Sequence, residues 1–232
     1  DFAEVTPSKL ADSEFYNSFY LELFRRYKSY EELNTNWRKK KEEIVEWIAN
    51  RISKSARILS FGCGLGYMEY LMHERYGNMF ELHVYDQSDV ALKWLQNSLP
   101  PGRIHFSLSP DKIARFDLIY LSAVDYAVPY NNMIELLSFI QKLLKEDGIC
   151  LVISASYIEN EIFLERIKAK IKEKIKVVLE KAGFYNRGQF WGWMRDRKEY
   201  NKLMEKAGYI DINDGFIETD SQRTYFIEGH NR

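Results

Sequence analysis

The sequence has only two cysteines, no surplus of charge of either sign and no long apolar run. Cys63 and Cys150 stand far apart among the 232 residues, and neither belongs to a C-x-x-C motif. This pattern predicts a reduced, cytoplasmic protein without structural zinc. The formal net charge of -1 gives no basic field that would attract nucleic acid. No apolar run approaches the length of a membrane span, so we expect no membrane partner.

Histidine is scarce as well. The four histidines have no metal-ligand spacing, so we predict structural roles for them and no metal site; they are His73, His83, His105 and His230. Two basic runs, residues 38–41 and 168–176, have glutamates nearby. We interpret both runs as solvated helix faces.

Aromatic residues are abundant by contrast, at 15% of the chain. They cluster in residues 15–24 and 184–193. Rings at helical spacing pack in a core more often than they bind ligands. A cluster of Trp, Tyr and Phe can nevertheless stack on a sugar face or attract an ammonium group. We interpret the two clusters as material for a lid over a pocket.

The segment that is richest in information runs from an apolar strand at residues 57–61 into a turn with glycines at 62, 64 and 66. Glycine permits positive φ and lets a ligand approach main-chain N–H groups closely. A helix that follows from Tyr67 would add its N-terminal dipole. The turn could also be a plain strand-to-helix connection that binds no ligand.

Asp86 ends the next apolar strand, residues 81–85, twenty residues after Gly66. A carboxylate at this place can accept both hydroxyls of a ribose, which predicts a cofactor that contains a nucleoside. The spacing G-x-G-x-G followed by Tyr67 differs from the dinucleotide motif G-x-G-x-x-G, where a third glycine lets the helix pack beneath a pyrophosphate. A nicotinamide dehydrogenase is therefore disfavoured.

Strands and helices alternate between residues 57 and 154. We expect strands at 57–61, 81–85, 103–106, 116–121 and 148–154, with helices to about 75, over 88–97 and over 131–144. This alternation predicts a parallel sheet with helices on both faces. After a helix over 196–207, two strands at 209–217 and 223–228 are joined by a short turn, residues 219–222, which requires an antiparallel pair.

The glycine spacing, Asp86 and the final hairpin resemble the class I S-adenosylmethionine-dependent methyltransferases. The resemblance implies an α/β fold with a Rossmann-like doubly wound sheet in three αβα layers, mostly parallel with a C-terminal antiparallel hairpin. We add helical lid elements and divide the chain into a helical cap (1–50), the cofactor-binding core (51–155), a helical and aromatic lid insertion (156–195) and a last helix with the hairpin (196–232).

The resemblance also implies the cofactor S-adenosylmethionine, the product S-adenosylhomocysteine and the residues that contact them. The glycine loop would lie against the methionine part, Asp86 would hold the ribose, and residues after the third strand would contact the adenine. The predicted contacts are Gly62, Cys63, Gly64, Gly66, Asp86, Gln87, Ser107, Leu108 and Ser122. The family often has an acid two places before the first glycine, where this chain has Ser60.

The segment after residue 121 would face the transferring methyl group in the resembled family. Asp125 could act as general base and Tyr126 could position the acceptor, with Tyr20 as a third catalytic candidate. Asp125 could equally cap a turn before Pro129 while Tyr126 is packed. The predicted acceptor contacts are Tyr16, Tyr20, Tyr126, Tyr185, Trp191, Trp193 and Arg195. Arg195 would bind an anionic acceptor such as a phosphate or nucleotide sugar.

These features together predict a methyltransferase for a small polar metabolite, as a monomer or homodimer. Oxygen is favoured as the acceptor atom because of Asp125, with a sugar or sugar derivative as one acceptor class. Two alternatives stay open: N-methylation of a small amine or phospho-base, which the ring clusters favour, and a non-catalytic protein that binds a nucleoside ligand on the same scaffold.

Overall fold

The computed structural model describes residues 12–77, 79–96, 98–159, 193–220 and 223–232, with a few isolated positions between 171 and 182. Most of the predicted insertion at 156–195 and part of the turn at 219–222 lie outside these ranges. Among the described residues, no helix combines the length and the apolar character that crossing a membrane requires.

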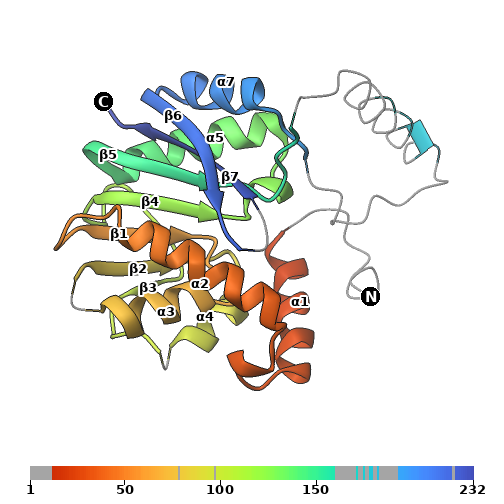
Figure 1. The fold of residues 1–232 in the computed structure, drawn as a ribbon, viewed down its shortest axis with the longest axis vertical. Helices are drawn as coiled ribbons and strands as arrows, with labels where there is room; N and C mark the ends of the chain where they lie inside the picture. Colours follow the sequence, from red (N-terminus) through yellow and green to blue (C-terminus); the bar gives the residue numbers. More distant parts are fainter. Residues whose placement is uncertain are drawn as a thin grey trace.

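One seven-stranded sheet organises the chain, in the order β3-β2-β1-β4-β5-β7-β6 (Figure 1). The strands β1 to β5 are parallel, whereas β7 is antiparallel to both β5 and β6. The predicted α/β fold with a C-terminal antiparallel hairpin is confirmed. The strands are β1 (Arg57–Phe61), β2 (Glu81–Tyr85), β3 (Ile104–His105), β4 (Phe116–Ser122), β5 (Leu144–Ile153), β6 (Ile210–Glu218) and β7 (Arg223–His230).

The helices begin where the sequence offers capping side chains. Asp12, Asn34 and Ser88 each accept a hydrogen bond from a main-chain N–H in the first turn of α1, α2 and α4, which satisfies a donor that has no partner within the helix. Gly208 ends α7 in the left-handed conformation. The helices are α1 (Ser13–Arg26), α2 (Thr35–Ala49), α3 (Tyr67–Tyr76), α4 (Asp89–Leu95), α5 (Tyr130–Leu143) and α7 (Arg197–Ala207), with short 3-10 helices η2 (Tyr30–Glu32) and η3 (Asp125–Ala127).

Two apolar cores lie on opposite faces of the sheet. Alternate strand residues contribute to each, as Ile58 and Leu59 of β1 illustrate, because successive side chains of a strand point to opposite faces. The helices α2, α3 and α4 cover one face, and α5 and α7 cover the other. This arrangement is the predicted three-layer αβα sandwich, and Figure 1 shows α1 near the carboxyl ends of the parallel strands.

Several strand bounds differ from the prediction, and the differences at β5 and β3 have a physical reason. β5 begins at Leu144 rather than at residue 148, because Leu144 already pairs with Phe116 before a register shift in β4. β3 has only two residues, since it is the edge strand and Phe106, just beyond it, is 48% exposed. Neither difference moves the carboxyl ends of β1, β2 and β4, where the predicted site residues lie.

Candidate active site

The glycine turn links β1 to α3 with all three glycines in the left-handed region. Their φ angles are 78°, 58° and 70° for Gly62, Gly64 and Gly66. A Cβ atom on Gly62 would come within 2.5 Å of the Val124 side chain, and one on Gly66 would collide with Leu95. Side chains are therefore excluded here by both backbone conformation and space, and the turn presents bare main chain to the carboxyl edge of the sheet.

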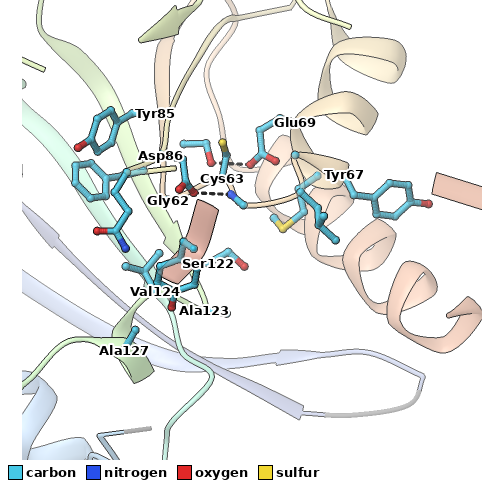
Figure 2. Close-up of a pocket in the computed structure, with 18 of the residues that line it drawn as sticks. Gly62, Cys63, Tyr67, Glu69, Tyr85, Asp86, Ser122, Ala123, Val124 and Ala127 are labelled. Atoms are coloured by element: carbon cyan, nitrogen blue, oxygen red, sulfur yellow. Dashed lines mark hydrogen bonds between the residues drawn. The ribbon is translucent and has the colours of Figure 1, made fainter. Parts of the chain in front are cut away.

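Asp86 at the end of β2 holds this turn in place. One carboxylate oxygen accepts a hydrogen bond from the Gly64 N–H at 2.8 Å (Figure 2). The other accepts one from the Ser88 N–H, also at 2.8 Å. The side chain is only 6% exposed, and burial raises its pKa while these N–H donors work in the opposite direction. Each oxygen keeps a second lone pair, so the carboxylate can still accept ribose hydroxyls.

A cavity of about 450 Å³ opens over the turn. That volume is in the range of small-molecule sites. Its walls come from α1, α2, the glycine turn, the start of α3 and the ends of β2 and β4. Predicted site residues that line it are Tyr16, Tyr20, Gly62, Cys63, Gly64, Gly66, Asp86, Gln87, Ser122 and Tyr126.

Two tyrosine hydroxyls meet at this cavity. The Tyr16 and Tyr126 oxygens are 3.4 Å apart, and the ring of Tyr20 stacks on that of Tyr16 with centroids 6.0 Å apart. Burial raises the pKa of all three phenols above the ordinary value of 10.0, so they stay protonated at neutral pH. They can donate and accept hydrogen bonds, but they do not supply a base.

Asp125 does not face the cavity. Its side chain has 0% exposure, and its carboxylate accepts hydrogen bonds from Ser154 Oγ (2.7 Å), the Ala155 N–H (3.2 Å), Ser156 Oγ (2.8 Å) and the Tyr200 hydroxyl. Four hydrogen-bond donors surround the Asp125 carboxylate, and a methyl-acceptor substrate in the cavity does not reach it. The prediction of Asp125 as general base is therefore not supported, because a base must come within hydrogen-bond distance of the proton it removes. The side chain anchors η3, the element that carries Tyr126.

Comparison with known proteins places this geometry in a family. A family model described as a methyltransferase domain matches residues 30–212. The chain belongs to that methyltransferase family. No curated protein has a significant sequence match to this chain.

Solved structures share the fold of this methyltransferase at low sequence identity. A magnesium protoporphyrin IX methyltransferase from Synechocystis PCC 6803, with bound S-adenosylhomocysteine, has a TM-score of 0.62 and 15% identity, covering 95% of this chain and 97% of that one. An O-methyltransferase family protein from Burkholderia thailandensis has a TM-score of 0.57 and 14% identity, covering 99% and 66%. Human N-acetylserotonin methyltransferase, in complex with S-adenosylmethionine, has a TM-score of 0.56 and 15% identity, covering 95% and 56%.

The seven-stranded sheet and the glycine turn are those of a class I S-adenosylmethionine-dependent methyltransferase. The chain is thus an enzyme of the predicted class, with the predicted cofactor. The turn without side chains and the buried Asp86 beside it fit a nucleoside ligand. The described residues contain no group of three or more His, Cys, Asp or Glu side chains able to hold a metal ion.

Two predicted acceptor residues, Trp193 and Arg195, lie beside the cavity wall but not in it. Arg195 is 2% exposed and donates hydrogen bonds to the carbonyl oxygens of Asp125, Val128 and Trp193. The Trp193 N–H donates to the Tyr126 carbonyl. Main-chain acceptors occupy both terminal nitrogens of the buried guanidinium, and Arg195 does not line the cavity, so the prediction that it binds an anionic acceptor is not supported. Tyr185 and Trp191 lie outside the described residues.

The predicted adenine contacts also lie away from the lining. Ser107 is exposed and Leu108 packs against the core formed with α5 and α7, and neither belongs to the cavity wall. Both follow the short edge strand β3, which pairs with β2, the strand that ends just before Asp86. A contact between either residue and the cofactor stays a prediction.

Two charged residues in the cavity were not predicted. Glu69 of α3 is 2% exposed, and Lys41 of α2 is partly buried with Nζ 3.0 Å from Ser122 Oγ. Lys41 belongs to the basic run at 38–41, so the interpretation of that run as a solvated face is wrong at this position. The available signal was the helical period, because Lys41 lies on the same face as Trp37, Ile44 and Ile48.

Proposed function

We propose that this methyltransferase transfers the methyl group of S-adenosylmethionine to a hydroxyl oxygen of a small polar metabolite, with sugars and sugar derivatives as the first acceptors to test. The observation that carries the proposal is the pair of hydroxyls from Tyr16 and Tyr126, which lie 3.4 Å apart at the cavity that also contains the glycine turn. Such a pair can align an acceptor hydroxyl by donating and accepting hydrogen bonds at once.

The cofactor would be held by the glycine turn, Asp86, Gln87 and Ser122, all of which line the cavity. When bound, it supplies an electrophilic methyl group on a positively charged sulfur. The residues of the chain then have to align the acceptor with that methyl and exclude water. Tyr20 and Phe19 of α1 line the cavity, with the Tyr20 hydroxyl close to Gly64, and support the second task.

The proton of the acceptor has no base among the described side chains at this wall. The tyrosine hydroxyls stay protonated, and Asp125 is enclosed by its own donors. We therefore assign alignment and desolvation to these residues, and the acceptor hydroxyl gives its proton to solvent as it enters the cavity, before water is excluded. This chemistry favours acceptor hydroxyls that are acidic, such as phenols or sugar hydroxyls next to an electron-withdrawing group.

The test is an acceptor panel with S-adenosylmethionine that carries a carbon-13 methyl group. Nuclear magnetic resonance distinguishes a methyl on oxygen from one on nitrogen by its chemical shift. We expect O-methyl products from a hydroxylated acceptor and none from the matched amine. Transfer to the amine alone would overturn the choice of oxygen.

N-methylation is the second candidate, because aromatic rings enclose the cavity. Tyr16, Phe19, Tyr20 and Trp37 line it, and such rings attract ammonium groups. A quaternary ammonium product should then bind, and Tyr20→Ala should weaken it by roughly tenfold, the upper range of one cation–π contact. Equal affinity of both proteins for that product would remove the support for this candidate.

A further inference from the structure

Glu69 is a buried acid, and only one of its two carboxylate oxygens has hydrogen-bond partners in the described part of the chain. Its Oε1 accepts hydrogen bonds from Ser60 Oγ at 2.6 Å and from the Tyr120 hydroxyl at 2.5 Å. Its Oε2 is buried and has no hydrogen-bond partner in the part of the chain that the structure describes. A buried carboxylate oxygen without a donor is unfavourable, and in a ligand cavity it indicates a donor that comes with the ligand.

Ser60 stands at a position where the family often has an acid, and Glu69 of α3 brings a carboxylate to the same place. Ser60 lies two places before Gly62, and its hydroxyl points at Glu69. Figure 2 shows Glu69 on the α3 side of the glycine turn. The carboxylate missing from the end of β1 is thus replaced in space by one from the first turn of α3. Burial raises the pKa of Glu69. A cation that binds beside the carboxylate would lower this pKa again.

Lys41 brings the opposite charge to the same cavity. Its Nζ donates to Ser122 Oγ at the end of β4, and burial lowers its pKa to about 8, with Glu69 acting in the opposite direction. Among the described residues, no ion pair within 4.0 Å joins Lys41 to Glu69, although both line the cavity. The Lys41 ammonium and the Glu69 carboxylate line one cavity without pairing with each other. A zwitterionic ligand could form a charge-assisted hydrogen bond with each of them.

We propose that Glu69 binds the α-ammonium group of the methionine end of S-adenosylmethionine and that Lys41 binds its α-carboxylate. This inference rests on the cofactor assigned above. The two residues lie on different helices, so they act as a clamp on a zwitterion and fix the direction in which the sulfonium enters the cavity. The clamp would distinguish the amino-acid end of the cofactor from any neutral extension of an adenosine.

Binding calorimetry with four ligands tests the clamp without any turnover. The ligands are S-adenosylhomocysteine, its analogue without the amino group, its analogue without the carboxylate, and 5′-methylthioadenosine, which lacks both. The proteins are the wild type, Glu69→Gln and Lys41→Met, with Glu74→Gln on α3 and Lys39→Met on α2 as matched controls. Glu74 and Lys39 are exposed and do not line the cavity.

We expect Glu69→Gln to weaken S-adenosylhomocysteine and the decarboxylated analogue by about 10- to 100-fold, the range for a hydrogen bond to a charged group. It should leave the deaminated analogue and 5′-methylthioadenosine unchanged. Lys41→Met should show the reverse selectivity, weakening only the two ligands that keep the carboxylate. Each variant is compared with itself across ligands, so a general loss of stability does not imitate the result.

Three outcomes separate the inference from its premise. If wild-type protein binds neither S-adenosylhomocysteine nor 5′-methylthioadenosine, the cofactor assignment fails and the clamp fails with it. If the wild type binds both, but each variant loses the same factor for all four ligands, the cofactor stands and the clamp is refuted. If the wild type binds 5′-methylthioadenosine as tightly as S-adenosylhomocysteine, the cavity does not recognise a zwitterion and the clamp is likewise refuted.

Discussion

Asp125→Asn distinguishes a structural anchor from a general base. The carboxylate accepts four hydrogen bonds, three of them at Oδ2 and one at Oδ1 from the Ala155 N–H. Asparagine keeps the shape but replaces one oxygen with an NH₂ group. If its oxygen takes the place of Oδ2, its NH₂ group faces the Ala155 N–H, and two donors then oppose each other in a buried site.

The expected cost follows from these contacts. A buried donor without an acceptor costs about 1–3 kcal/mol, and the remaining hydrogen bonds lose the strengthening that a charged acceptor gives. We therefore expect the free energy of unfolding to fall by about 2–4 kcal/mol. For a chain of this size, the melting temperature would drop by roughly 5–15 °C. Tyr126 follows directly in η3, so a modest loss of activity would accompany the change.

Urea unfolding and the rate of a single turnover are the two measurements. Loss of a general base would lower the rate by about 10²–10⁴-fold with stability intact. We expect the opposite: a clear loss of stability and less than a tenfold loss of rate well below the melting temperature. Ser156→Ala is the control, because it removes one donor and leaves the carboxylate in place. Unchanged stability with a hundredfold slower turnover would refute the reasoning.

Three further substitutions or conditions test the site and the sheet. Gly66→Ala should cost at least about 2 kcal/mol in urea unfolding, because it adds left-handed strain to a steric collision; a neutral effect would contradict the geometry. Tyr126→Phe should lower kcat/KM by about 3- to 10-fold, the value of one hydrogen bond, with the Kd of S-adenosylhomocysteine unchanged; a weakened Kd would place Tyr126 at the cofactor. Burial lowers the pKa of both His83 and His105 to about 4, so the unfolded chain, with histidine pKa 6.5, binds more protons between these values. The free energy of unfolding should therefore fall as pH drops from 6.5 to 4, and less steeply in His105→Asn; equal slopes would show that the pair is not responsible.

The fold could be predicted because its signals are local. Strands and helices alternate with clear boundaries from Arg57 onward, and the short turn before Arg223 requires the antiparallel hairpin. The glycine turn and Asp86 could be located for the same reason, since each follows directly from the end of a strand. The edge strand β3 was overestimated because its length depends on pairing with β2, which the residues of β3 do not reveal.

The charged and polar groups of the site were predicted less well, because their roles depend on tertiary contacts. Asp125 follows β4, as catalytic residues do, but the serines that enclose it come from the residues just after β5, and the tyrosine comes from α7. Arg195 reads as an anion-binding residue, yet main-chain carbonyls from distant segments occupy it. Glu69 and Lys41 belong to no motif; the helical period places Lys41 on the buried face of α2, but only the cavity shows that the two side chains share one site.

The most direct test of the account is calorimetry of S-adenosylhomocysteine with the wild type and Asp86→Asn. The cavity over the glycine turn should bind one equivalent, and the substitution should weaken binding by about 10- to 100-fold, because it removes a charged acceptor from the ribose hydroxyls. S-adenosylhomocysteine that fails to bind the wild type while NADH binds, or an affinity that Asp86→Asn leaves unchanged, would contradict it.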